Sequence, residues 1–172
     1  MDFCTEYIIK QKKSPLVYLA GAGMVVATLL VWILTLPFLG VAALSGLIGL
    51  VDAGMIYLSY IVITSFNIEY EYIVTNTYLD VDKIINRRKR KRIISVNFSK
   101  MELMAPVGFP DFRAEENGNF AKVYMAAKSA DDTNAYYIIT DDKGGRTKLI
   151  FSPTEKMVEN AKRIAARKVY TK

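Results

Sequence analysis

The spacing of apolar and charged positions divides the chain into two parts. No charged residue occurs from Ser14 to Val51, and this stretch contains the apolar run of residues 15–36. Its 22 residues would form a helix of about 33 Å, enough to cross the ~30 Å hydrocarbon layer of a membrane. A second apolar run covers residues 41–63, and the PFLG segment between the runs punctuates the helix. The pattern predicts a transmembrane helical hairpin over residues 15–63.

Lysine and arginine near the helix ends predict the orientation of this hairpin. Lys10, Lys12 and Lys13 precede the first helix, a basic run at residues 87–92 follows the second, and the connection carries no charge. By the positive-inside rule, we expect a multi-pass protein of the cell membrane with both termini cytoplasmic, residues 1–14 forming an N-terminal segment. The alternatives are a signal peptide, for which the first run is too long, and a soluble pair of buried helices.

Asp52 is the one charged residue inside the second predicted helix, where an acidic group is costly and seldom faces lipid. Ser45, Gly49 and Asp52 share a helix face, and Thr28 lies on a similar face of the first helix. One interpretation is helix packing, with Asp52 protonated or hydrogen-bonded to Thr28 or to a second copy of the chain. The other is an ion or proton site. A single carboxylate without a charged partner favours packing.

Beyond the second run, the pattern changes from helical to alternating. In IEYEYIVT, residues 68–75, Glu69 and Glu71 alternate with aromatic and apolar residues, as in a half-buried strand. Similar short runs bounded by turn residues follow: YLDVDKII, RIISVNF, MELMAP, NFAKVYMAA, AYYIIT and RTKLIF. We therefore predict an antiparallel β domain of about seven strands over residues 66–172, which makes the chain an α+β membrane protein.

The end of the chain has the signals of a helix over residues 153–170. The SPTE sequence that begins at Ser152 offers a cap residue, a proline at the first helical position and a glutamate three residues after the cap. A modest apolar stripe follows, and the cations in the second half suit the helix dipole. We expect this helix to close the β domain.

Seven strands followed by a C-terminal helix is the element order of the pleckstrin-homology-like (PH-like) fold. The segment EYEYIVTNTYLDVDKIINRRKRKRIISVNFSKMELM resembles the opening of bacterial PH-like domains, where a Tyr-x-[apolar]-Thr strand leads to a second strand, a basic turn and an Ile-started strand. The matching positions are Tyr72, Val74, Thr75, residues 87–92, Ile93, Ile94, Met101 and Leu103. The chain departs from the pattern at Tyr78-Leu79-Asp80, where Arg-Leu is usual, and in its long segment 105–118.

Bacterial members of this family often carry two membrane helices just before the domain. The resemblance therefore implies a PH-like fold and a binding role at the membrane, with no particular ligand. It covers residues 66–104 by pattern and the remainder by element order.

Composition narrows the chemistry that the chain can perform. It has no histidine, and Cys4 is its one cysteine. Ser-His and Cys-His nucleophiles, an intramolecular disulfide and a cysteine-based zinc site are therefore excluded. The acidic pairs Asp131-Asp132 and Asp141-Asp142 lie in turn-like stretches, where acids commonly just solvate the chain. We expect no enzyme activity, no cofactor and no metal.

The basic run is the main candidate for a binding site. Residues 68–172 hold 20 Lys and Arg against 14 Asp and Glu, and without the run the two counts are equal at 14. Charge confined to one turn, with no aromatic residue to stack a base, argues against nucleic acid as a partner. The candidates for the turn are a solvated hairpin, contact with anionic lipid headgroups, or an acidic protein partner. Its residues are Arg87, Arg88, Lys89, Arg90, Lys91 and Arg92.

Together these observations predict a membrane-anchored cytoplasmic PH-like module that binds or scaffolds through a basic hairpin. Its partners would be anionic lipid headgroups or a protein, with homo-oligomers formed through the transmembrane helices. The alternative is a small oligomeric transport, channel or accessory subunit built around Asp52, with Thr28 and Ser45 as the other intramembrane polar residues.

Overall fold

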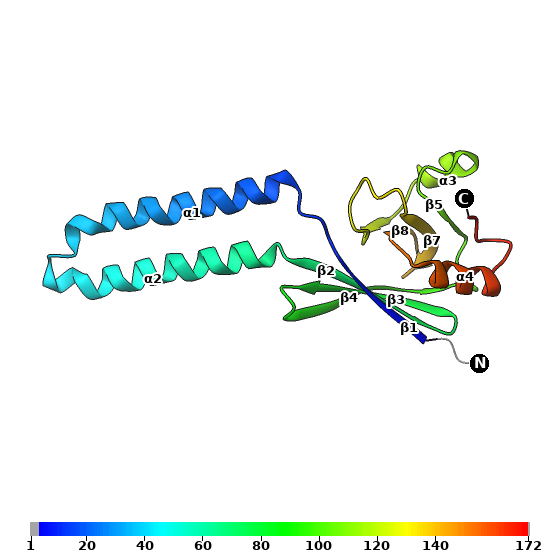
Figure 1. The fold of residues 1–172 in the computed structure, drawn as a ribbon, viewed down its shortest axis with the longest axis horizontal. Helices are drawn as coiled ribbons and strands as arrows, with labels where there is room; N and C mark the ends of the chain where they lie inside the picture. Colours follow the sequence, from blue (N-terminus) through cyan, green and yellow to red (C-terminus); the bar gives the residue numbers. More distant parts are fainter. Residues whose placement is uncertain (1–3, 172) are drawn as a thin grey trace. The chain divides into compact units, whose positions relative to one another are not determined.

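The computed structural model describes residues 4–171, which divide into two compact units (Figure 1). Residues 13–67 form a helical unit, and the residues before 13 join those from 68 onward in a β unit. In chain order, the helical unit is therefore an insertion within the β unit.

The helical unit is an antiparallel pair of helices, α1 (Pro15–Thr35) and α2 (Ala42–Ser65), connected through the short 3-10 helix η1 (Leu36–Phe38). By length and composition, both long helices could cross a membrane. Their less exposed residues recur at spacings of three and four, the pattern of left-handed helix packing. These seam residues are Gly21, Met24, Thr28, Val31 and Thr35 in α1, and Ile48, Asp52, Met55, Ser59 and Val62 in α2.

The first sheet of the β unit contains a strand for which the sequence analysis had no counterpart. Its order is β1 (Cys4–Lys10), β2 (Ile68–Thr75), β3 (Tyr78–Ile85) and β4 (Lys89–Asn97), all antiparallel. Every residue of β1 has a partner in β2, from Cys4 opposite Thr75 to Lys10 opposite Glu69. The stretch 1–14, which we expected to lie outside the domain, thus supplies its edge strand. β1 escaped notice because Ile9 is its one buried residue, too little for a visible alternation.

The second sheet brings the described total to eight strands. Its order is β5 (Leu103–Pro106), β7 (Tyr136–Asp142), β8 (Gly145–Phe151) and β6 (Lys122–Met125). β6 pairs with β8 in parallel, the one departure from an antiparallel arrangement in the two sheets as described. The long segment between β5 and β6 contains the short helices η2 (Pro110–Phe112) and α3 (Arg113–Glu116). The predicted antiparallel β class is confirmed in this form.

The C-terminal helix α4 (Glu155–Ile164) is shorter than the predicted 153–170. Ser152 does not cap it, because its hydroxyl accepts the Lys128 amide and donates to Asp132, and the cap position falls on Thr154 without a side-chain hydrogen bond. After Ile164 the chain leaves the helical conformation and runs beside β5, where Val169 bridges to Met104. Met157, Val158 and Ala161 of α4 join the hydrophobic core.

Tyr72 of β2 connects the two sheets at the centre of this core. Its side chain is fully buried, and its hydroxyl donates to the Ala126 carbonyl (2.5 Å) and accepts the Ser152 amide (3.2 Å). Its ring meets the Phe151 ring edge-on, with centroids 5.6 Å apart. Burial raises the pKa of this hydroxyl, so it remains a donor.

We predict that Tyr72→Phe lowers the free energy of unfolding by about 1–3 kcal/mol, because two buried backbone groups lose their partner. Urea unfolding of the full chain in detergent micelles, followed by circular dichroism, measures the change. Tyr78→Phe is the control, since Tyr78 is half exposed on the outer face of the same sheet. Equal effects of the two substitutions would contradict this role for Tyr72.

Candidate functional site

The sequence suggested that all six cations lie in one turn. In the structure, the first two lie in a turn and the other four begin strand β4. Asn86, Arg87 and Arg88 make the turn between β3 and β4, with φ of 50° at Asn86 and 53° at Arg87. Lys89 to Arg92 belong to β4, where side chains alternate between the two faces of the sheet. The six cations are therefore sorted onto different surfaces.

A β-bulge at Ile93 separates the charged first half of β4 from its apolar second half. Arg92 lies opposite Asp82, and the next residue of β3, Val81, lies opposite Ile94. Ile93 is the extra residue, so the alternation is reset between Arg92 and Ile94. Because of this reset, Arg92 points to the outer face while Ile94 enters the core.

Three arginines of the run form ion pairs on the outer face of the first sheet. Arg90 Nη2 lies 2.7 Å from Oε1 and 2.5 Å from Oε2 of Glu71, with the hydrogen bond going to Oε1. Arg92 contacts Asp80 and Asp82, each at 2.9 Å, and the hydrogen bond to Asp82 raises its pKa. Arg87 Nε lies 3.4 Å from Glu69. These arginines neutralise acids of β2 and β3.

Glu71 is the acid for which such a partner matters most. It is fully buried, and burial raises its pKa, with a hydrogen bond to Glu6 adding to the effect and the charge of Arg90 opposing it. A buried carboxylate is costly unless it is paired. Arg90 therefore has a structural role in the sheet.

The lysines of the run lie on the other face. Lys91 is directly opposite Lys83 of β3, and Lys89 is opposite Ile85. Within residues 4–171, none of these three lysines takes part in an ion pair. Like charges opposite each other in a sheet are destabilising, so an anion between Lys83 and Lys91 would be stabilising.

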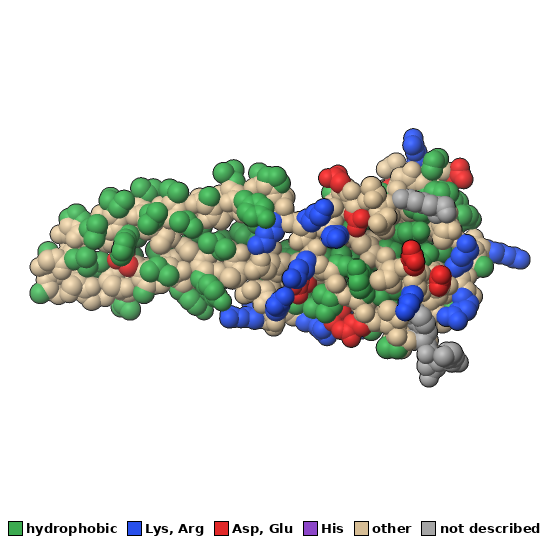
Figure 2. Space-filling view, viewed as in Figure 1, with side chains coloured by type: hydrophobic (Ala, Val, Ile, Leu, Met, Phe, Trp, Pro, Cys, Tyr) green, Lys and Arg blue, Asp and Glu red, His purple; other side chains and the backbone are tan. Residues whose placement is uncertain are grey.

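This lysine face lies at the end of the sheet from which both connections to the helical unit leave. The Gln11 amide, one residue beyond β1, donates to the carbonyl of Ile68, the first residue of β2. Ile68 pairs with Ile85, which in turn pairs with Lys89. Figure 2 shows lysine and arginine side chains gathered at this end of the β unit.

Of the three polar residues predicted within the helices, Thr28 and Asp52 each contact a residue of the other helix, and Ser45 does not. The Thr28 hydroxyl lies 2.6 Å from that of Ser59, and the Thr35 hydroxyl donates to both oxygens of Asp52, at 3.1 and 3.3 Å. The partner of Asp52 within the chain is thus Thr35, one heptad along α1 from the expected Thr28. Ser45 lies beyond the end of α1 and donates to the carbonyl of Ala42 in its own helix.

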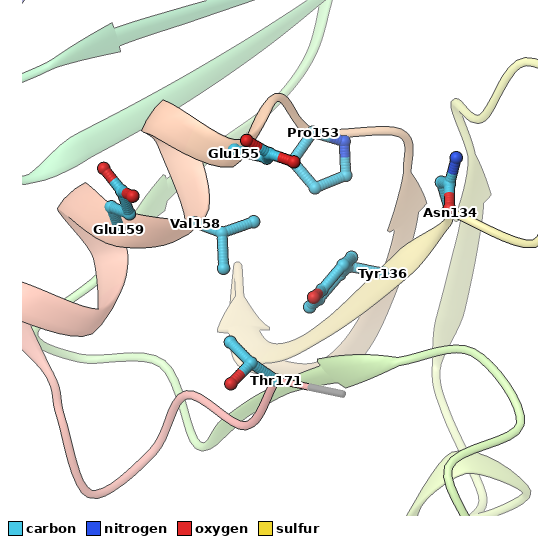
Figure 3. A pocket seen from close by; sticks show the side chains of 7 residues that line it. All are labelled: Asn134, Tyr136, Pro153, Glu155, Val158, Glu159 and Thr171. Atoms are coloured by element: carbon cyan, nitrogen blue, oxygen red, sulfur yellow. The ribbon is translucent and has the colours of Figure 1, made fainter.

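A hollow of about 400 Å³ lies beside α4, a place that the sequence did not indicate (Figure 3). The Tyr136 ring and the Val158 side chain face each other across it, and the carboxylate of Glu159 points away. Its lining comes from three segments that are distant in sequence, so no local sequence pattern could predict it. The lining residues are Asn134, Tyr136, Pro153, Glu155, Val158, Glu159 and Thr171. Burial raises the pKa of Tyr136, which keeps its hydroxyl neutral.

In each of the two acidic pairs singled out in the sequence, one acid has a structural partner. Asp132 accepts the Ser152 hydroxyl, and Asp141 accepts the Gly144 amide at the β7–β8 turn. In the described part of the chain, no three His, Cys, Asp or Glu side chains come together as a metal site. Cys4 is exposed on β1.

Comparison with protein families matches residues 1–171 to one family, described as "Bacterial PH-like domain (DUF6106)". Searches of curated proteins and of solved structures gave no match. The match begins ahead of the helical insertion and includes β1, in agreement with the pairing of β1 and β2. The resemblance drawn from the β2–β5 segment is confirmed.

We predict that Arg90→Gln lowers the free energy of unfolding by about 1–3 kcal/mol, because it leaves the buried Glu71 without its cation. Lys91→Gln should change it by less than about 0.5 kcal/mol, since that lysine has no acidic partner and faces Lys83. Denaturant unfolding of both variants in the same detergent tests this sorting. A loss for Lys91→Gln as large as for Arg90→Gln would contradict it.

Proposed function

The chain belongs to this family of bacterial PH-like domains, and on that premise we propose that it is a membrane-anchored binding module. Its helical unit would cross the membrane, and the lysine face formed by Lys83, Lys89 and Lys91 would contact anionic lipid headgroups. The observation that carries the proposal is the unpaired lysine face at the sheet end where the helical insertion leaves the β unit.

The surface of the helical unit supports the membrane part of the proposal. α1 has no buried residue, and large apolar side chains such as Leu16, Leu19 and Leu34 are each more than two-thirds exposed. Exposed apolar area of this extent is not stable in water and requires cover. Hydrocarbon provides that cover over the length of both helices.

The pairing of β1 with β2 supports a particular topology. β1 precedes α1 and β2 follows α2, yet the two strands are hydrogen-bonded neighbours. Both ends of the helical unit must therefore lie on one side of any membrane that it crosses, which requires two crossings. The lysines at positions 10, 12 and 13 and those of the β unit then favour the cytoplasmic side.

Short connections support contact between the lysine face and the lipid headgroups. Phe66 and Asn67 alone separate α2 from β2, a gap that an extended chain bridges in about 10 Å at most. A lysine near an anionic surface gains about 1 kcal/mol. Tethering keeps the local concentration of lipid high, so three lysines would suffice to hold the hairpin at the surface.

A second reading of the lysines is that they protect an edge strand. β4 is the last strand of its sheet, and lysines on such edges prevent pairing with other chains. An acidic protein partner is a third reading. We propose no catalytic role. A transport role is not favoured, because Asp52 is the one charged residue within α1 and α2 and has no charged partner there.

We predict that the hairpin of residues 84–92 exchanges its amide hydrogens more slowly in nanodiscs containing phosphatidylglycerol than in phosphatidylcholine alone. The expected cause is protection by headgroups bound to the lysines. Lys89→Gln combined with Lys91→Gln should remove the difference between the two lipids.

Lys122→Gln combined with Lys143→Gln is the matched control, which removes the same charge elsewhere in the β unit and should preserve the difference. Edge protection predicts aggregation of the first variant in both lipids. Equal exchange of the unaltered hairpin in the two lipids would refute lipid contact.

A further inference from the structure

The carboxyl group of Glu71 has one oxygen without a hydrogen-bond donor. Glu71 is fully buried in β2, and the Arg90 guanidinium donates to its Oε1. Arg90 Nη2 also lies close to Oε2, but this contact lacks hydrogen-bond geometry, and within the described chain Oε2 is a buried acceptor without a partner. A buried polar atom of this kind costs free energy, so Oε2 requires a donor.

The strand register brings a second carboxyl group to Glu71. In the antiparallel pairing of β1 with β2, Ile8 lies opposite Glu71. Glu6, two residues before Ile8, stands on the same face of the sheet as a diagonal neighbour of Glu71, a separation that long side chains bridge. The two carboxyl groups are hydrogen-bonded, which contributes to the raised pKa of Glu71. Carboxylate ions have only acceptors, so a hydrogen bond between two of them requires a proton.

The balance of charges on this face also favours a bound proton. Around Glu71 the face holds four acids and two arginines, namely Glu6, Glu71, Asp80 and Asp82 against Arg90 and Arg92. Arg92 is engaged by Asp80 and Asp82, which leaves Arg90 for the two glutamates. Two glutamates that share one proton carry a single negative charge, and one guanidinium balances it.

We propose that Glu6 and Glu71 share one proton, and that this proton fastens the edge strand β1 to β2. The hydrogen lies between the Glu6 carboxyl and Oε2 of Glu71, while Oε1 keeps its bond from Arg90. In alkaline solution the proton passes to water and leaves two adjacent carboxylates, whose repulsion weakens the pairing of the strands. The proposal does not depend on lipid binding by the β unit.

The sign of the pH dependence follows from the groups that face Glu71. These are Glu6 from β1, Asp82 from β3 and Arg90 from β4. Burial and the two acids raise the pKa of Glu71, and Arg90 opposes them. The stabilisation is therefore present in mildly acidic solution and is lost as the pH rises through the raised pKa. Because β1 precedes the helical unit and β2 follows it, the closure of the sheet at this insertion becomes sensitive to pH.

Infrared spectroscopy of the full chain in detergent micelles in D₂O tests for the shared proton, because a protonated carboxyl group has a carbonyl band separate from that of a carboxylate. An Asp52→Asn background removes the carboxyl group of α2 from this spectral region. The band should be present at neutral pH and decline as the pH is raised. Glu6→Gln and Glu71→Gln should each abolish it, since either change leaves one carboxylate that needs no shared proton. Glu69→Gln is the matched control and should keep the band, because Glu69 lies on the same face of β2 and pairs with Arg87.

The lone cysteine gives a second readout, the attachment of β1 to β2. Cys4 is exposed and lies opposite Thr75, so in a Thr75→Trp variant the tryptophan should quench a bimane label on Cys4 while the strands are paired. Quenching should weaken as the pH rises and become independent of pH when Glu6→Gln is added. A spectrum without the band at neutral pH, a band that survives Glu6→Gln, or equal quenching in mildly acidic and mildly alkaline solution would each overturn the proposal.

Discussion

The hydrogen-bonded pairing of β1 with β2 is the constraint on which the rest of the structure depends. The two strands are separated in sequence by the whole helical unit, and all seven residues of β1 nevertheless have partners in β2. Pairing over this length brings the two ends of the insertion together. It also makes the helical unit a very long loop between neighbouring strands of a PH-like sheet, in place of an anchor attached to one end of a domain. Both connections to the helical unit therefore leave from the same end of this sheet.

The same sheet explains how a run of six cations can be both structural and available for binding. Alternation along β4 sends Arg90 and Arg92 to the acids of the outer face and Lys89 and Lys91 to the opposite face. The division suits the chemistry of the two residue types. A planar guanidinium matches a carboxylate in a fixed geometry, whereas a lysine ammonium is a mobile point charge suited to exchangeable anions such as headgroups. The bulge at Ile93 keeps this division from disturbing the core.

Elements that follow from a long local pattern could be predicted from the sequence. Contacts between residues distant in sequence could not. The helices extend close to their predicted bounds, because an uncharged run of such length has few alternatives. The alternation of apolar and polar residues in β2 and β3 likewise allowed both strands to be predicted. β1 could not be recognised, since its meaning comes from β2 more than fifty residues later. The capping sequence at Ser152 was misleading because that hydroxyl is engaged by Lys128 and Asp132. The expected partner of Asp52 within the chain was wrong by one heptad, because the sequence pattern does not give the register between the two helices.

The pairing of β1 with β2 can be tested by a disulfide across the helical insertion. Cys4 lies opposite Thr75, and Cα atoms in such antiparallel pairs are about 4.5–5.5 Å apart, within the range of a disulfide. Thr75→Cys in the full chain, purified in detergent micelles, should therefore cross-link to Cys4 on mild oxidation, and digestion followed by mass spectrometry should detect the joined peptides. Ser95→Cys, exposed on β4 two strands beyond β2, should leave Cys4 free. Failure of Thr75→Cys to cross-link while both thiols still react with a maleimide, or equal cross-linking at Ser95→Cys, would contradict the account.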